Sequence, residues 1–253
     1  MKERIDILGI RVDPISVTEL HAEILKAVRG GDHALILNVN THALNLCYRD
    51  PPLRAFFNSA PVVFCDGAGV MLAARILGTH LPERITYADW APKLASFAES
   101  EGISLFFLGA RPGVAEKAAA RLLARHPKLR IVGVHHGYFD RAPGSPENEA
   151  VLEEINTAKP DILLVGFGMP LQERWLMQNW DRIDARVALT GGAVFDYVSG
   201  ELERGPRLLT DNGFEWLARL LIEPRRLWRR YVFGNPLFLL RVLKQRLTRN
   251  GSS

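Results

Sequence analysis

Apolar and polar positions along the first hundred residues change period several times, which indicates short strands and helices in alternation. Residues 5–12 alternate as in a strand with one buried face. Continuous apolar runs, typical of strands buried on both faces, occur at 33–39 and 61–65. Helical spacing predicts three helices among these strands: one that Ser16 or Thr18 caps and that runs to residue 28, one over 41–48 and one over 70–77.

From about residue 103 the alternation of strands and helices becomes regular. Strands that alternate with helices and are buried on both faces form parallel sheets with right-handed crossovers. The expected fold class is therefore α/β, with a parallel sheet flanked by helices. The predicted strands are 104–108, 130–134, 161–165 and 186–190, and the predicted helices are 114–125, 147–158 and 172–180.

The pattern changes after residue 200, where we expect a core over 1–205 to give way to a helical appendage over 206–253. Helical spacing returns over 213–222, Pro224 can begin a second helix, and Gly234-Asn235-Pro236 is expected to break the chain before a third. The last helix is amphipathic and places leucines opposite Arg241 and Gln245. Such a leucine stripe fits either a bilayer interface or the protein's own core.

Charge is distributed unevenly along the 253 residues. From residue 207 on there are ten basic and three acidic residues, a formal charge of +7, whereas the chain totals +4, so residues 1–206 carry −3. This segregation suggests a local anionic partner. The chain is 47% hydrophobic, enough for a sizeable core. No apolar leader and no run near the ~20 residues of a spanning helix is visible, so we expect no secretion and at most peripheral membrane contact.

Ligands of open parallel sheets bind beyond the carboxyl ends of the strands, so residues that follow the predicted strands are the candidates for a site. Asp66 directly follows an apolar strand and can serve as a general base, although it can also cap the next helix. Glycine-containing turns permit close approach to phosphate, but none has the spacing of a P-loop or a dinucleotide fingerprint. The other candidates at strand ends are Asn38, Asn40, Thr41, Gly109, Gly168, Pro170 and Gln172.

Two further features bear on the chemistry. Arg84, in Pro82-Glu83-Arg84, can orient Asp66 or bind an anion, and a surface ion pair is the alternative interpretation. His135 and His136 have no carboxylate at metal spacing, no D-x-D motif occurs, and the two cysteines match no metal or redox spacing. We therefore expect neither a metal nor a cofactor.

Several segments in the same order resemble the WecG/TagA/CpsF family of bacterial glycosyltransferases from about residue 35 to 238. The most specific is G-F-E-W-L-A-R-L-x-x-E-P-R-R-L-W-R-R-Y at 213–231. The others are N-x-N-T at 38–41, D-G-x-G at 66–69, P-E-R-I at 82–85, G-F-G-M-P-L-Q-E at 166–173 and G-G-A-V-F-D at 191–196.

The resemblance implies a Rossmann-like core and an inverting, metal-independent transfer from a UDP-sugar to a polyprenyl-diphosphate-linked saccharide. The donor sugar would be of the ManNAc, ManNAc uronate or glucose class. The enzyme would lie at the inner face of the cell membrane, and it could form homo-oligomers. By the same resemblance Asp66 is the base, and Asn40, Arg84 and Gln172 line the sugar and nucleotide site. The arginines that would hold the diphosphate of UDP are Arg225, Arg226, Arg229 and Arg230.

Two other functions fit parts of the sequence. Arginines interleaved with aromatic residues can bind nucleic acid, but the basic segment is confined to the last fifth of the chain and leaves Asp66 without a role. A nucleotide-binding module without turnover is the second alternative, and it predicts UDP binding with no transfer product. We expect the transferase, with no nucleic acid as partner.

Overall fold

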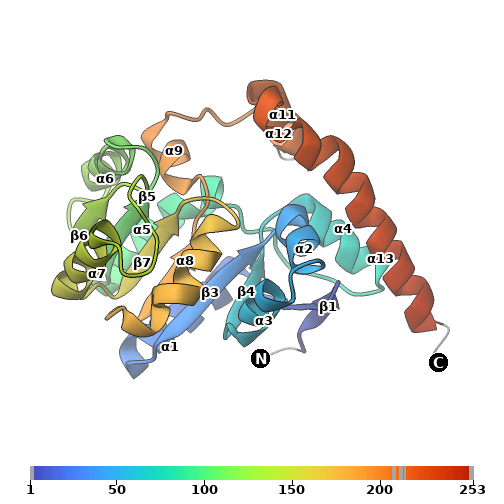
Figure 1. Cartoon of the computed structure of the whole chain (residues 1–253), viewed down its shortest axis with the longest axis horizontal. Coiled ribbons are helices and arrows are strands. Elements are labelled where there is room, and N and C mark those ends of the chain that lie inside the picture. The colour runs from blue at the N-terminus through green and yellow to red at the C-terminus, as the bar shows by residue number, and fades with distance from the viewer. Residues whose placement is uncertain (1–2, 207–208, 211–212, 214, 251–253) are drawn as a thin grey trace. The chain divides into compact units, whose positions relative to one another are not determined.

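A computed structural model describes residues 3–206, 209–210, 213 and 215–250; the side chains of Arg226, Arg249 and Asn250 lie outside this description. The centre of the fold is a six-stranded, all-parallel sheet with the strand order β4-β3-β8-β7-β5-β6 (Figure 1). This confirms the predicted α/β, Rossmann-like class. The strands are β3 (Ala34–Val39), β4 (Val62–Cys65), β5 (Ser104–Gly109), β6 (Arg130–His135), β7 (Ile162–Gly166) and β8 (Val187–Thr190).

The sheet forms where the apolar runs occur. Every residue of β3, β4, β5, β7 and β8 is buried, because helices cover both faces of these strands, while the edge strand β6 is partly exposed. The predicted helices are confirmed within one or two residues. They are α1 (Val17–Gly30), α2 (Thr41–Cys47), α4 (Ala68–Ile76), α6 (Val114–Arg125), α7 (Pro146–Ala158) and α8 (Leu171–Asn179), the last followed by a 3₁₀ turn (Trp180–Arg182).

Within the described ranges, the sequence pattern did not predict three of the helices. The helix α3 (Pro51–Ser59) begins with two prolines in its first turn, where the missing amide donors cost little. The helix α5 (Tyr87–Glu101) carries Pro92 inside its span, which hides its periodicity, and α9 (Val194–Ser199) is only six residues long. Prolines in α3 and α5, and the shortness of α9, therefore made these segments resemble loops in the sequence.

The first predicted strand is wrong in detail. Residues 5–12 form two antiparallel strands, β1 (Ile5–Ile7) and β2 (Ile10–Val12), instead of one. Leu8 and Gly9 make the turn between them with φ angles of 54° and 84°. Positive φ at both central residues is the geometry of the tight hairpin turn that matches strand twist, and glycine is the residue that adopts it without strain.

The chain divides into two compact units. One unit comprises 1–16, 38–86 and 204–253, and the other comprises 17–37 and 87–203. The predicted division into a core over 1–205 and an appendage over 206–253 stays a prediction. The C-terminal segment belongs to the same unit as the residues that follow β3 and β4. Asp66 is one of these residues.

The expected chain break at Gly234-Asn235-Pro236 is also wrong. The helices α11 (Glu215–Ile222) and α12 (Pro224–Trp228) lead into a π-helix (Arg229–Phe233), which continues directly into α13 (Gly234–Asn250). Gly234 has ordinary helical dihedral angles, φ −66° and ψ −41°. Proline is tolerated in the first turn of a helix, and the wider π-turn before it replaces the usual hydrogen-bond pattern.

The polar side of α13 faces the unit to which it belongs. Its Gln245 side chain accepts a hydrogen bond from the Leu8 amide at 2.9 Å, and Arg246 donates to the Leu77 carbonyl at 3.1 Å. Arg241 donates to Asn45 Oδ1 at 2.6 Å and lies over the Tyr48 ring at 4.2 Å. Polar contacts of α13 with α2, α4 and the β1–β2 turn thus hold this helix in place.

The leucine stripe of α13 points outward. Leu240, Leu243 and Leu247 are 65%, 47% and 73% exposed. Of the two interpretations of this stripe, packing against the core of its own unit is therefore wrong for these three leucines. No helix within the described ranges is both long enough and apolar enough to cross a bilayer.

Candidate functional site

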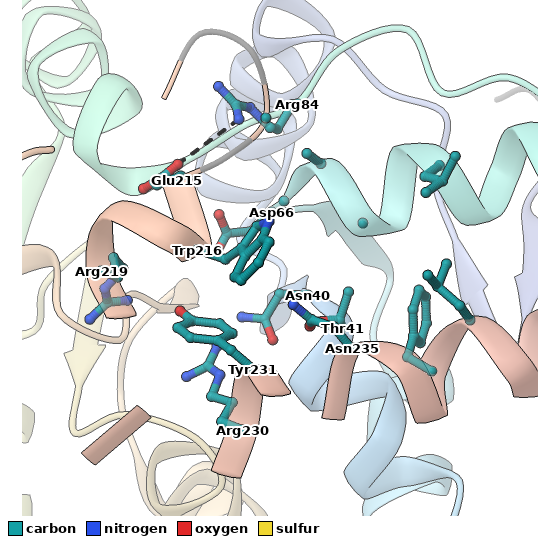
Figure 2. Close-up of a pocket in the computed structure, with 17 residues that line it drawn as sticks. Asn40, Thr41, Asp66, Arg84, Glu215, Trp216, Arg219, Arg230, Tyr231 and Asn235 are labelled. Atoms are coloured by element: carbon teal, nitrogen blue, oxygen red, sulfur yellow. Dashed lines mark hydrogen bonds and ion pairs between the residues drawn. The ribbon is translucent and has the colours of Figure 1, made fainter. Parts of the chain in front are cut away.

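A pocket of about 420 Å³ opens in the unit that contains β4 and the C-terminal helices (Figure 2). Its walls come from segments far apart in the chain: the residues that follow β3 and β4, the start of α4, the loop around Arg84, α11, the π-helix and α13. The ends of two neighbouring parallel strands and a glycine-rich turn are thereby combined with the basic C-terminal segment. This is the place where the sequence predicts the chemistry.

Asp66 lies at the carboxyl end of β4 and lines the pocket. Its backbone amide donates to the Val39 carbonyl at 2.8 Å, which continues the pairing of β4 with β3. Asn38 donates from Nδ2 to Asp66 Oδ2 at 2.8 Å. The N-cap of α4 is Gly67, and no side chain caps that helix. The alternative interpretation of Asp66 as a helix cap is therefore wrong, and its carboxylate is directed to the pocket.

The surroundings of Asp66 raise its pKa to about 6, chiefly through burial and secondly through the negative charge of Glu215. The hydrogen bond from Asn38 and the positive charges of Arg230 and Arg219 oppose this rise in pKa. A carboxyl with a pKa near 6 is ionised at neutral pH and still basic enough to accept a proton from a hydroxyl in a transition state. Asp66 thus has the position and the acidity of a general base.

Asn40 and Thr41 also line the pocket, at the start of α2. Asn40 is the N-cap of that helix, since its Oδ1 accepts from the amides of His42 and Ala43 at 3.0 and 3.1 Å. Thr41 donates from its hydroxyl to Asn235 Oδ1 at 3.1 Å, which joins α2 to α13. Both residues therefore combine a structural role with a place in the wall of the pocket.

Arg84 lines the same pocket and is tied to the C-terminal segment. Its Nη2 donates to the Thr210 carbonyl at 3.0 Å, and its Nη1 lies 4.0 Å from Glu215 Oε2 (Figure 2). The side chains of Arg84 and Glu215 are 19% and 21% exposed. The ion pair is therefore part of the pocket wall, and the interpretation of Arg84 as a surface ion pair does not hold.

The predicted diphosphate arginines occupy different places. Arg230 lines the pocket, whereas Arg225 is exposed and Arg229 lies with its guanidinium 5.3 Å from the centre of the Trp228 ring. The side chain of Arg226 lies outside the described residues. Arg219, which the residue assignments above omit, lines the pocket together with Arg230. Three arginines, Arg84, Arg219 and Arg230, thus line the pocket with Asp66, and Arg219 was not predicted.

Further lining residues were missed by sequence reasoning. Glu215, Trp216 and Arg219 project from the first turns of α11, and Tyr231 from the π-helix (Figure 2). Positions i, i+1 and i+4 share one side of a helix, so their spacing groups these residues of α11. The spacing does not reveal that this side of α11 faces Asp66, because that contact is tertiary.

The remaining predicted residues lie in the other unit, at or after the carboxyl ends of β5 and β7. Gly109 has a φ of 152°, and a Cβ built on it would lie 2.5 Å from the Gly166 carbonyl oxygen, so close strand contact already requires glycine there. Gly168 and Pro170 form the turn before α8. None of these residues lines the pocket in front of Asp66.

Gln172 is fully buried and connects two of these turns. Its Oε1 accepts from the amides of Gly168 and Gly192 at 3.2 and 3.0 Å, while its Nε2 donates to Glu173 Oε1 at 2.8 Å. Burial raises the pKa of Glu173 to about 7, and the hydrogen bond from Gln172 opposes this rise. The structure shows Gln172 as a clamp between the loops that follow β7 and β8, and its predicted contact with substrate stays a prediction.

Metal ligands do not gather anywhere in the described ranges. No group of three or more His, Cys, Asp or Glu side chains within them is arranged to hold a metal ion. His135, which has no carboxylate at metal spacing in the sequence, lies against His136 and Phe139 at the end of β6, with ring centroids 4.6 and 5.5 Å away. Among the described residues, the guanidinium groups of Arg230 and Arg219 place positive charge near Asp66.

Comparison with known proteins agrees with the sequence motifs. A sequence profile described as the glycosyl transferase WecG/TagA/CpsF family matches residues 5–252. The N-acetylglucosaminyldiphosphoundecaprenol N-acetyl-beta-D-mannosaminyltransferase of Staphylococcus aureus strain MRSA252 is 28% identical over 243 residues, covering 95% of this chain and 92% of that protein. Proteins of the same name from strains NCTC 8325 / PS 47 and MW2 are 28% and 27% identical with the same coverage. The chain belongs to the WecG/TagA/CpsF family of glycosyl transferases.

Proposed function

We propose that this protein transfers an N-acetylmannosamine-class sugar from a UDP-sugar to an N-acetylglucosamine carried on a polyprenyl diphosphate. The relatives' name describes such an acceptor and such a transferred sugar, and the alignment with them covers nearly the whole of both chains. The observation that carries the proposal is the Asp66 carboxylate, which faces the pocket with its pKa raised to about 6 and two arginines beside it.

The proposed reaction is a single displacement. An acceptor hydroxyl attacks the anomeric carbon of the donor, Asp66 accepts the hydroxyl proton, and the bond from that carbon to the diphosphate oxygen breaks, so that UDP leaves with the bonding electron pair. Attack from the side opposite the leaving group inverts the configuration at the anomeric carbon. Asn38 supports this role of Asp66, because its amide at 2.8 Å from Oδ2 holds the carboxylate in one orientation at the wall of the pocket.

Metal independence is part of the proposal. Departure of a diphosphate builds negative charge, and guanidinium groups stabilise such charge by paired hydrogen bonds to phosphate oxygens. Arg219 and Arg230 line the pocket, and we assign this task to their guanidinium groups. We expect turnover to persist in excess EDTA; loss of activity that Mg²⁺ or Mn²⁺ restores would contradict this part of the proposal.

We further propose that the exposed leucines of α13 contact the membrane that contains the lipid acceptor. Leu240, Leu243 and Leu247 form a stripe, and the basic Lys244 is exposed beside them. An apolar stripe flanked by cations is the pattern of helices that lie in a bilayer interface, where anionic lipid headgroups attract the basic residues. The proposed location is therefore the inner face of the cell membrane.

The test is a transfer assay with purified full-length protein. UDP-ManNAc, UDP-ManNAc uronate, UDP-glucose and UDP-GlcNAc are each incubated with a short-chain polyprenyl diphosphate N-acetylglucosamine, and UDP release, product mass and anomeric configuration are measured. We expect one disaccharide product with inverted configuration. UDP binding with no product from any donor would instead support a module without turnover.

A further inference from the structure

The pocket in front of Asp66 has an aromatic wall that the proposed chemistry of Asp66 leaves without a role. Trp216 lines the pocket with 36% of its surface exposed, and Tyr231 lines it from the π-helix. Their ring centroids are 6.0 Å apart and the ring planes meet at 56°, so the rings form a corner instead of a stack (Figure 2). A large apolar ring that is about one-third exposed inside a charged pocket fits a ligand with an apolar face.

The reacting hydroxyl determines which substrate meets this wall. A general base must lie within hydrogen-bonding distance of the proton it removes, and in this reaction that proton belongs to the acceptor sugar. The acceptor ring therefore lies in the pocket that Asp66 shares with Trp216 and Glu215. Trp216 and Glu215 are therefore expected to contact the acceptor sugar.

A pyranose ring has the two surfaces that this pocket offers. Its C–H groups form an apolar face, which an indole ring can cover at low conformational cost, whereas its hydroxyl groups form a polar edge that needs acceptors. Trp216 supplies the apolar surface, and Asp66, Glu215 and Asn40 supply oxygen atoms around it. Positions 215, 216 and 219 share one side of α11, so one helix presents a carboxylate and an indole to the acceptor sugar and a guanidinium to the diphosphate of the donor.

The rest of the pocket wall also fits an amphiphile. Leu72 of α4 together with Phe238 and Leu239 of α13 line the pocket, and Leu72 is 44% exposed. A polyprenyl diphosphate sugar carries a sugar, a charged diphosphate and an apolar chain, whereas a UDP-sugar has no apolar chain to place there. The composition of the wall therefore favours the acceptor as the occupant.

We propose that Trp216 is the platform on which the acceptor sugar stacks, with Tyr231 closing one side and Glu215 binding a hydroxyl of the same ring. The inference rests on the proposed function, and it assigns the aromatic wall of this pocket to the acceptor sugar, while Arg219 and Arg230 of the same pocket remain assigned to the diphosphate of UDP. It also assigns to α11 a part in choosing the acceptor.

The test compares the contribution of the acceptor sugar to binding with the contributions of the prenyl diphosphate and of the nucleotide. Binding is measured by calorimetry for three probes: N-acetylglucosamine diphosphate on a short prenyl chain, the same prenyl diphosphate without sugar, and UDP. The variants are Trp216→Ala, Trp216→Phe and, as a matched control, Leu221→Ala, which alters a 70% exposed side chain of the same helix outside the pocket. Circular dichroism melts check that each variant folds.

We expect Trp216→Ala to weaken binding of the sugar-bearing probe about 10-fold while the sugar-free probe and UDP bind as to the wild type. Trp216→Phe should recover most of the affinity, because a smaller ring still covers the C–H face, and Leu221→Ala should change nothing. Unchanged affinity of Trp216→Ala for the sugar-bearing probe would overturn the inference. An equal loss for UDP would also overturn it, because the wall would then serve the nucleotide.

The result stays interpretable if Trp216→Ala does not fold or if no turnover is found. Saturation-transfer NMR on the wild type should show magnetisation reaching the sugar C–H protons from aromatic protons, and this transfer should diminish in Trp216→Phe; its absence in the wild type would refute the stacking. If the wild type shows turnover and Trp216→Ala binds the sugar-bearing probe with undiminished affinity, the role of Trp216 is refuted and the proposed transfer stands. If the wild type shows no turnover and Trp216→Ala loses affinity for the sugar-bearing probe, the proposed transfer is refuted and the sugar-binding role of Trp216 stands.

Discussion

At the scale of single residues, the site depends on how the neighbours of Asp66 set its proton affinity. Burial and Glu215 raise the pKa of Asp66 to about 6, and Asn38, Arg230 and Arg219 oppose the rise. Cys65, the residue before it, has its pKa raised by burial and by Asp66, so this thiol stays protonated and inert at neutral pH. Burial, and secondly the positive charge of Arg230, lower the pKa of His42 to about 4, so its imidazole is neutral at neutral pH.

The first prediction concerns the base itself. Because Asp66 accepts a proton only when ionised, kcat/KM should rise with pH through about 6 and level off above it. Asp66→Asn should keep its hydrogen bond with Asn38 and its fold while losing at least about 100-fold in kcat, the usual share of a general base. The check is a pH profile of UDP release with UDP binding measured in parallel. Turnover like that of the wild type in Asp66→Asn would remove Asp66 from the mechanism.

The second prediction tests the influence of Glu215 on Asp66. A negative neighbour raises the pKa of a carboxyl, so Glu215→Gln should lower the pKa of Asp66 and shift the acidic limb of the kcat/KM profile to lower pH. Glu203→Gln, an exposed carboxylate outside the pocket, is the control and should leave the limb in place. If the acidic limb of Glu215→Gln moves to higher pH, Glu215 lowers the pKa of Asp66 instead of raising it, and the prediction is wrong.

At the scale of elements, the loops after β7 and β8 depend on a buried carboxyl. Glu173 is 1% exposed, its Oε1 accepts from Gln172, and its Oε2 has no hydrogen-bond partner in the described part of the chain. The pKa of Glu173 is raised from 4.5 to about 7 by burial, so between these values the folded state binds more protons than the unfolded state. The free energy of unfolding therefore falls as pH rises through this window.

The third prediction follows from that sign. Glu173→Gln can still accept a hydrogen bond from Gln172 but cannot ionise, so its melting temperature should match the wild type near pH 4.5 and exceed it increasingly up to about pH 8. The measurement is thermal unfolding by circular dichroism at several pH values. Glu154→Gln, an exposed residue of α7 in the same unit, should follow the wild type throughout. Parallel curves for Glu173→Gln and the wild type would contradict the raised pKa.

The fourth prediction belongs to α13. Since Leu240 and Leu243 are exposed, changing both to Gln should leave the melting temperature near that of the wild type and weaken flotation with anionic vesicles several-fold. Leu221→Gln, exposed on α11, provides the comparison for a leucine outside the stripe. Undiminished vesicle binding by the double variant would show that the stripe of α13 does not meet the bilayer.

At the scale of the whole molecule, the C-terminal segment belongs to the fold of one unit. Arg241, Gln245 and Arg246 bind backbone or side-chain groups of α2, the β1–β2 turn and α4 respectively, and Phe238 and Val242 are buried. Removal of this segment would expose apolar surface and delete a wall of the pocket. Interactions spread over seventeen residues of α13 thus couple stability to the site.

The fifth prediction is that a chain ending at residue 206 melts at a lower temperature and shows no turnover even with a soluble acceptor. The physical reason is that Arg219, Arg230 and Trp216 leave the pocket together with the buried anchors of α13. Thermal unfolding and UDP release are the measurements. Full turnover of the truncated chain with a soluble acceptor would mean that the segment serves only as an anchor.

Periodicity was sufficient for most elements of this protein and insufficient where local and tertiary effects conflict. The buried strands and the helices after them follow from continuous apolar runs and from spacing, which are local properties. The break expected at Gly234-Asn235-Pro236 did not occur, because contacts of α13 with its unit and a π-turn accommodate the proline. The hairpin at Leu8 and Gly9 was missed because a two-residue turn leaves the alternation of the flanking strands nearly intact.

The sequence by itself determined the α/β class, the family motifs and the candidacy of Asp66, since each depends on residue type and order. Only the tertiary structure decided that Arg219 accompanies Arg230 while Arg225 is exposed, that Trp216 faces the pocket, and that Leu240, Leu243 and Leu247 of α13 are exposed. Spacing shows which residues share a side of a helix, whereas the direction of that side depends on how distant segments pack. The function of the arginine-rich segment is decided by that packing.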